Sequence, residues 1–226
     1  MGRIRLVIFD IAGTIIEDHG EVLSSFRSAL EKNGISATDA ELAEWKGASK
    51  QEVIRHFVER EHADNRQSKI DKTYSDFRSL LEDQYRQGVH PIAGVEETFT
   101  WLREHGILIA TTTGFYRDVN ELILEKTGWK KWLRASISSS DVTQGRPAPL
   151  MIFRAMEEAG VSAALEVINV GDTPLDLQAG SNAGVAGVVG VLTGLHQHAR
   201  LRREPHTHII GSVAELPALL QKDFQA

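Results

Sequence analysis

The alternation of short apolar segments with amphipathic ones constrains the fold of this chain more than any other feature of its sequence. Runs typical of buried strands occupy residues 4–9, 107–111, 135–138, 167–170, 185–192 and 208–210. Segments with helical spacing lie between them at 95–105, 117–126, 149–159, 175–183 and 213–220. Strand–helix alternation predicts a parallel sheet with right-handed crossovers. We therefore predict an α/β fold with a Rossmann-like, doubly wound parallel sheet as its core.

One long interval interrupts this alternation. Between the first and second predicted strands, residues 17–89 show helical spacing throughout, as at Val22 and Phe26. A helical insertion at this point predicts two domains. We expect an α/β core domain made of residues 1–16 and 90–226, and an inserted α-helical cap domain made of residues 17–89.

Composition narrows the possible partners. The 226 residues include 25 Lys and Arg against 31 Asp and Glu, so the formal net charge is -6, and no basic cluster offers a surface for nucleic acid or an anionic membrane. The absence of Cys excludes disulfides, thiolate nucleophiles and cysteine-ligated metals, so any metal must be held by oxygen or histidine. The N-terminal segment has the pattern of neither a signal peptide nor a transmembrane span. We expect a cytoplasmic monomer or homodimer that binds no nucleic acid and no membrane.

Polar residues follow several predicted strands, at the edge where parallel sheets bind ligands. Asp10 ends the first strand, Thr112 follows the second, and Asp172 follows a third, with Asp176 one helical turn later. Arg146 lies in a loop before a helix. The alternative interpretation is that the Asp and Thr residues only cap the following helices.

This set of residues suits an anion held beside a hard cation. Mg²⁺ prefers oxygen ligands and is commonly held by one or two carboxylates together with a phosphate. Asp10 and Asp172 fit that role. Thr112, its neighbouring amides and Arg146 would bind the remaining phosphoryl oxygens.

The same residues form four motifs in an order that resembles the haloacid dehalogenase superfamily of phosphohydrolases. The motifs are Val7-Ile8-Phe9-Asp10-Ile11-Ala12-Gly13-Thr14, Ile109-Ala110-Thr111-Thr112, Gly145-Arg146-Pro147-Ala148-Pro149 and Val170-Gly171-Asp172-Thr173-Pro174-Leu175-Asp176. The resemblance covers essentially the whole chain, including the position of a helical cap.

The resemblance implies a role for each motif residue. Asp10 would be the nucleophile that forms an aspartyl-phosphate. Asp10, the backbone carbonyl of Ala12 and Asp172 would bind Mg²⁺, with Asp176 acting through water or orienting the other ligands. The transferring group would be held by Thr112, Thr113, Gly114 and Arg146.

Ala12 departs from the usual superfamily pattern, in which an Asp protonates the leaving group. The form Asp-x-Ala-Gly-Thr resembles phosphonoacetaldehyde hydrolase, or phosphonatase, in which a cap lysine forms an imine with the substrate aldehyde. Lys50 has the spacing of that lysine, three residues after Gly47, although Val53 stands where phosphonatase has a His. The alternatives are that Lys50 contacts the substrate only through its charge, or that it is a solvated residue at a helix start.

These interpretations lead to one main hypothesis and two competitors. The chain is expected to be a Mg²⁺-dependent, phosphonatase-like hydrolase of a small phosphonate or phosphate metabolite. It could instead be a phosphomonoesterase like phosphoglycolate phosphatase, or a phosphate-binding protein with little turnover. A dehalogenase is disfavoured, because those relatives use no metal and lack the Gly171-Asp172 pair. His19 is a further candidate, because it could transfer the proton in place of the Asp that is missing at position 12.

Overall fold

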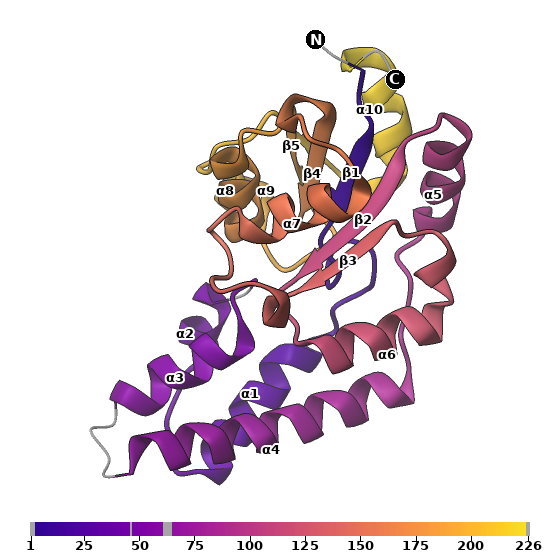
Figure 1. Ribbon diagram of the computed structural model, residues 1–226. Coiled ribbons are helices and arrows are strands. Elements are labelled where there is room, and N and C mark those ends of the chain that lie inside the picture. The colour runs from indigo at the N-terminus through magenta and orange to yellow at the C-terminus, as the bar shows by residue number, and fades with distance from the viewer. Residues whose placement is uncertain (1–2, 46, 61–64, 225–226) are drawn as a thin grey trace.

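The core of the molecule is a six-stranded parallel sheet with the strand order β3-β2-β1-β4-β5-β6 (Figure 1). The computed structural model describes residues 3–45, 47–60 and 65–224. The predicted α/β fold class, a doubly wound parallel sheet, is confirmed. The strands are β1 Leu6–Phe9, β2 Leu108–Thr113, β3 Ala135–Ser138, β4 Val167–Gly171, β5 Gly187–Val191 and β6 His208–Ile210.

Helices cover both faces of the sheet, and the side chains of the central strand show why. In β1, Leu6 and Ile8 join the hydrophobic cluster on one face, whereas Val7 and Phe9 join the cluster on the other. A strand buried on both faces carries apolar residues at every position instead of alternating apolar and polar ones. The sequence of β1 is apolar throughout, as this rule requires. The helices of the first face are α7 Leu150–Ala159 and α8 Pro174–Ala183, and those of the second are α5 Val95–Glu104, α6 Arg117–Thr127 and α10 Leu216–Asp223.

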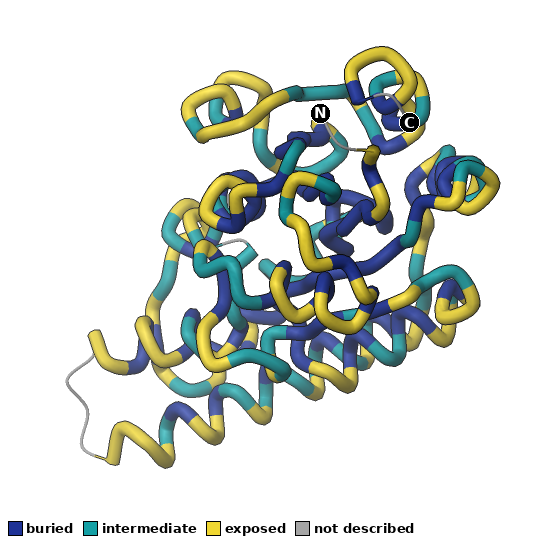
Figure 2. Tube along the Cα trace, turned by 45° about the horizontal axis from the view of Figure 1, so that its top comes forward, coloured by how far each residue is buried: buried dark blue, intermediate teal, exposed yellow. Residues whose placement is uncertain are grey.

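Four helices lie between β1 and β2 in the chain and form a group below the sheet in Figure 1. They are α1 Glu21–Lys32, α2 Asp39–Glu44, α3 Lys50–Arg60 and α4 Arg66–Gln87. Helix α4 packs against α1 and α3, and the rings of Phe26 and Phe77 stack with centroids 4.3 Å apart. One side of α4 is exposed along much of its length (Figure 2). The division into two domains stays a prediction, and residues 46 and 61–64 of the predicted cap lie outside the described residues.

The two chain segments that join this helical group to the sheet run side by side. The Glu17 amide donates to the His90 carbonyl at 2.8 Å, and the Ile92 amide donates to the Ile15 carbonyl at 3.0 Å. Short paired connections of this kind hold the helical group over the carboxyl ends of the strands, where the polar residues lie.

Between β5 and β6 the chain forms a short helix, α9 His198–Leu201, for which the sequence gives no prediction. Its last residue, Leu201, is fully buried in the cluster that contains α7 and α8. A single buried side chain amid charged residues gives too little periodicity to predict a helix. No helix in the described parts of the chain is long and apolar enough to cross a membrane.

Candidate active site

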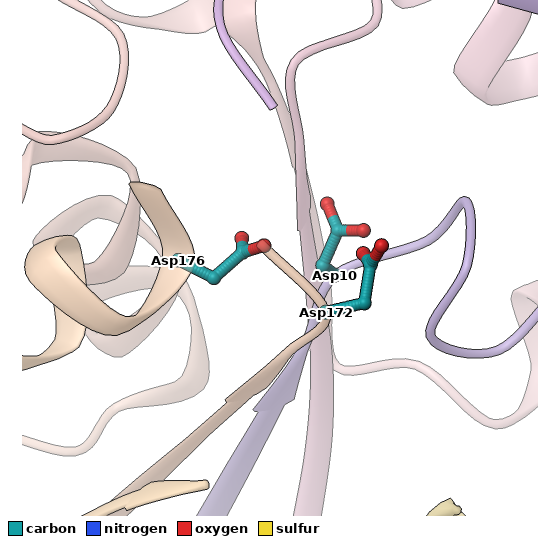
Figure 3. A group of neighbouring side chains, drawn as sticks. All are labelled: Asp10, Asp172 and Asp176. Carbon is teal, nitrogen blue, oxygen red and sulfur yellow. The ribbon is translucent and has the colours of Figure 1, made fainter. Parts of the chain in front are cut away.

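Three buried aspartates gather at the carboxyl edge of the sheet (Figure 3). Asp10 directly follows β1 and Asp172 directly follows its neighbour β4, while Asp176 lies in the first turn of α8. One carboxylate oxygen from each lies within 4.8 Å of those of the other two. Adjacent parallel strands end at the same edge, which explains how residues more than 160 positions apart in sequence come together.

Asp176 has two functions in this arrangement. Its Oδ2 accepts hydrogen bonds from the amide and the hydroxyl of Thr173, at 3.0 and 2.5 Å, and so completes a capping box at the start of α8. Its Oδ1 faces the cluster, 2.7 Å from Arg146 Nη1. Helix capping and membership of a polar site, which we treated as alternatives, therefore both hold for this residue.

Arg146 is the buried cation of the cluster. Its Nη1 donates to Asp10 Oδ1 at 2.7 Å, and its Nη2 donates to the carbonyl and the hydroxyl of Thr112, at 2.8 and 2.9 Å. With 6% of its surface exposed, the guanidinium is held by contacts on two sides. The structure thus brings together Asp10, Thr112 and Arg146, as the sequence motifs predict.

Negative charge in this cluster exceeds what Arg146 alone neutralises. Burial raises the pKa of Asp10 from 3.8 to about 6, with Arg146 opposing the shift and Asp176 adding to it. Burial also raises the pKa of Asp176, again against the attraction of Arg146. Both shifts arise because three carboxylates share a desolvated space, which is the electrostatic environment that a bound cation relieves.

The donor set fits a divalent cation. Only carboxylate oxygens are offered as ligands in the cluster, and oxygen is the donor that hard divalent cations prefer. The turn after Ala12 packs tightly on this site, because a side-chain carbon added at Gly13 would lie 2.6 Å from Asp172 Oδ2. Thr14 Oγ1 donates to Asp172 Oδ1 at 3.3 Å and helps to orient that carboxylate.

Three of the predicted phosphate-binding residues, Thr113, Gly114 and Lys50, line a small cavity beside Asp10, whereas Thr112 and Arg146 are not among its described lining residues. Thr113 is the last residue of β2, and its Oγ1 accepts a hydrogen bond from the Phe115 amide at 3.1 Å. The cavity has a volume of about 30 Å³, and its described lining residues are Asp10, Ala12, Asp18, Val22, Gly47, Lys50, Thr113, Gly114, Phe115 and Thr173. One pocket is therefore lined by Asp10, by Ala12 in place of the usual acid, by the loop after β2 and by Lys50.

Lys50 is buried in this cavity. It begins α3 and is only 5% exposed, so the solvated interpretation of Lys50 is wrong. Its Nζ donates to the Ala48 carbonyl at 3.3 Å and lies 5.1 Å from the centre of the Phe115 ring. A lysine that lines the same pocket as Asp10 is suited to contact the part of a substrate beyond its phosphoryl group.

Asp18 is a cavity residue that the sequence analysis missed. Asp18 lines the pocket with Asp10 and Lys50, whereas its neighbour His19 is an exposed residue whose Nε2 lies 2.9 Å from Glu17 Oε2. The direction of a side chain in a short linking segment depends on tertiary contacts, so spacing alone could not distinguish the two positions. Because Asp18 lines the pocket and its Oδ1 accepts a hydrogen bond from the Gly20 amide at 2.9 Å, it is a second candidate, beside His19, for the proton transfers that Ala12 cannot perform.

Comparisons with known proteins identify relatives of this chain. A family model described as haloacid dehalogenase-like hydrolase matches residues 7–190. Phosphonoacetaldehyde hydrolase of Bacillus cereus is 31% identical over 207 residues, which cover 85% of this chain and 77% of that protein. A bifunctional phosphonoacetaldehyde hydrolase/aminoethylphosphonate transaminase of Clostridioides difficile is 31% identical over 82% of this chain, which spans only 31% of that longer protein.

Solved structures share the fold. A phosphonoacetaldehyde hydrolase-like protein from Oleispira antarctica superposes with a TM-score of 0.86 at 24% identity, covering 97% of this chain and 92% of the other. A predicted phosphoglycolate phosphatase from Haemophilus somnus superposes with a TM-score of 0.81 at 18% identity, covering 98% of this chain and 100% of the other. At these identities the likeness concerns the fold.

Proposed function

Since this chain belongs to the haloacid dehalogenase-like hydrolase family, we propose that it hydrolyses a small phosphonate through an aspartyl-phosphate on Asp10. The observation that carries the proposal is that Lys50 and Asp10 line one cavity whose wall has Ala12 in place of an acid. A substrate of this site needs no proton on its leaving group if an imine accepts the electrons of the broken bond. Phosphonoacetaldehyde has an aldehyde that can form such an imine with a lysine, and relatives at 31% identity are named for its hydrolysis.

In the proposed reaction, Lys50 Nζ adds to the aldehyde carbon and loses water to give a protonated imine. Asp10 then attacks phosphorus, the carbon–phosphorus bond breaks, and its electron pair passes into the enamine. The enamine takes a proton on carbon, and hydrolysis of the imine releases acetaldehyde and frees Lys50. Water attacks phosphorus in the aspartyl-phosphate, which releases phosphate and restores Asp10.

Arg146 and the loop after β2 position the transferring group. Arg146 holds Asp10 through Oδ1 and is fixed by two contacts to Thr112, so the nucleophile is oriented before substrate binds. Thr113 and Gly114 line the same cavity, and their backbone amides would bind phosphoryl oxygens. Asp10, Asp172 and the Ala12 carbonyl would hold Mg²⁺ with the help of Asp176, and the bound ion would neutralise charge on the phosphoryl group.

Borohydride trapping tests the mechanism. We expect phosphonoacetaldehyde and borohydride to inactivate the wild type and to leave a reduced adduct on Lys50, detectable by peptide mass spectrometry. Lys50→Arg keeps the charge but cannot form the imine, so it should give no adduct and lose phosphate release from this substrate. Asp10→Asn should still form the adduct while releasing no phosphate. An adduct-free wild type that nevertheless cleaves phosphonoacetaldehyde would contradict the imine mechanism.

A phosphomonoesterase like phosphoglycolate phosphatase is the second candidate, and Asp18 is the observation that favours it. Asp18 lines the cavity with Asp10, and its carboxyl group would protonate an alkoxide in place of the missing Asp at position 12. The test is the rate of phosphate release from phosphoglycolate. If Asp18→Asn lowers this rate by about 10²-fold or more, the result would support this candidate. Phosphate binding without release, across phosphonates and phosphate esters with Mg²⁺, would favour a binding protein with little turnover.

A further inference from the structure

A second, apolar pocket opens directly beside the cavity that contains Asp10. The two pockets share Asp18, Val22 and Lys50, so they adjoin at these three residues. Beyond the shared residues, every described residue that lines the second pocket is apolar. A molecule that lies in both pockets would therefore have a polar end near Asp10 and an apolar end on the other side of Lys50.

The walls of this pocket come from three separate parts of the chain. Leu23 and Phe26 belong to α1, Leu42 and Ala43 belong to α2, and Leu195 belongs to the loop after β5. Phe26 and Leu42 are 3% and 2% exposed, so this wall is a packed surface. Leu195, in contrast, is 51% exposed, so the pocket reaches solvent beside it.

An apolar wall next to a phosphoryl site is not required for phosphonoacetaldehyde, whose aldehyde carbon carries only hydrogen beyond the carbonyl. We propose that this pocket binds a short apolar substituent on the leaving group, so that the substrate is a phosphonate or phosphate with an alkyl group beyond the atoms at Lys50. This inference rests on the proposed function, because it takes the phosphoryl group to lie at Asp10. The substituent would contact Leu23, Leu42 and Trp45 and displace water from them.

The size of the pocket limits the substituent. Its volume is about 20 Å³, somewhat more than the ~10–15 Å³ that one water molecule needs. One or two carbon atoms fit without movement of the walls, and longer chains would pass Leu195 into solvent. Burial of one methylene contributes about 0.8 kcal/mol, so each of the first carbons should strengthen binding about fourfold.

Titration with n-alkylphosphonates, from methylphosphonate to hexylphosphonate, tests the pocket without requiring turnover. Ligand-observed NMR in the presence of Mg²⁺ gives a Kd for each member. We expect Kd to fall about fourfold for each of the one or two methylenes after ethyl and then to level off, because the first two carbons take the places of the two carbons of phosphonoacetaldehyde. Equal or rising Kd values along the series, with methylphosphonate bound, would overturn the apolar pocket but leave the proposed function intact. No binding of any member would overturn both.

Two variants locate the effect. Ala43→Phe fills the pocket from α2, and Leu23→Trp fills it from α1, so each should abolish the dependence of Kd on chain length. Ala40→Phe places the same ring on an exposed position of α2 and should leave the dependence unchanged. Thermal unfolding of all three verifies that they fold. Retention of the chain-length dependence in both filled variants would overturn the assignment.

Discussion

At the scale of single residues, the cluster around Arg146 shows how a family motif is built into a stable fold. Each neighbour of the guanidinium also has a structural role. Asp176 caps α8, Thr112 belongs to β2, and Asp10 ends β1. The site residues are therefore held rigid by strands and a helix that are stabilised by their own packing. The crowding of three buried carboxylates, in contrast, destabilises the folded state.

This crowding predicts how the metal-free protein responds to pH. The pKa of Asp10 rises from 3.8 to about 6 on folding, so the folded state binds an extra proton between these values. The resulting contribution to stability is present below about pH 4 and is lost as pH rises through about 6, by as much as roughly 3 kcal/mol. Asp10→Asn should remove this loss, so its advantage over the wild type in free energy of unfolding should grow between pH 4 and pH 7.

Urea denaturation with a chelator present, at several pH values, measures this difference. Taking the difference between variant and wild type cancels the titration of the acids that do not interact with Asp10. Saturating Mg²⁺ should reduce the advantage of Asp10→Asn, because the cation compensates the charge of the cluster. A difference that stays constant from pH 4 to pH 7 would contradict the burial-raised pKa.

Gly114 predicts a second effect of a single residue. A side-chain carbon there would lie 2.6 Å from the Ala48 carbonyl oxygen and 2.8 Å from that of Gly47, closer than packed atoms tolerate. Gly114→Ala should therefore push the segment before Lys50 away from the loop after β2 and lower kcat/KM about tenfold or more, since small displacements are costly in catalysis.

Gly145→Ala is the matched control for this substitution. Its added carbon would meet its nearest neighbours at 3.6 Å, which is ordinary van der Waals contact. Steady-state kinetics of the two variants should separate them clearly. Equal kcat/KM values for Gly114→Ala and the wild type would show that the close approach of the two loops is unimportant for turnover.

At the scale of elements, α4 and α6 hold the helical group against the core. Tyr116, the residue before α6, donates its hydroxyl to Glu82 Oε1 at 2.9 Å and to the Arg78 carbonyl at 3.2 Å. The Arg78 guanidinium also lies 4.3 Å from the centre of the Tyr116 ring. Burial, with the nearby Glu82 carboxylate, raises the pKa of Tyr116, so its hydroxyl stays a donor across the physiological range.

Replacement of this hydroxyl should weaken the contact between α4 and α6. Tyr116→Phe keeps the ring over Arg78 but removes the hydrogen bond to Glu82 Oε1, so we expect a loss of about 1 kcal/mol in the free energy of unfolding. Tyr85→Phe, on the same α4, removes a buried hydroxyl that has no hydrogen-bond partner among the described residues and should cost nothing or stabilise. Chemical denaturation of both variants measures the contrast, and equal losses would argue against a specific role for Tyr116.

Most elements could be predicted from the sequence, because their strands and helices follow local periodicity, and the short helix α9 is the exception. The predicted strands at 135–138 and 208–210 coincide with β3 and β6, and the order of motifs predicted which residues meet Arg146. Contacts between distant segments could not be predicted in this way. The apolar pocket joins Leu23 to Leu195, and the direction of Asp18 is set by tertiary packing, so neither leaves a periodic signal in the sequence.

At the scale of the whole molecule, the structure has its helical group closed onto the sheet. The cavity beside Asp10 has a volume of about 30 Å³, against ~300–1,000 Å³ for typical ligand pockets. Gly47 contacts the start of α8 as well, since a carbon added there would lie 2.7 Å from Thr173 Oγ1. Entry of a substrate into this space therefore requires the helical group to move away from the core and return.

A reversible disulfide tests this movement, and the absence of native Cys makes the experiment clean. A side-chain carbon built at Gly145 lies 3.6 Å from the Ser49 Cβ, within the ~3.5–4.5 Å range of natural disulfides. Ser49→Cys combined with Gly145→Cys should therefore crosslink the start of α3 to the core. Phosphate release by the oxidised double variant should be at least about tenfold slower than by the same protein after reduction. Each single variant should respond to neither treatment. If the crosslinked protein, verified by mass spectrometry, turned over as fast as its reduced form, substrate would reach Asp10 without separation of the two parts, and the closed arrangement would itself be competent for every step.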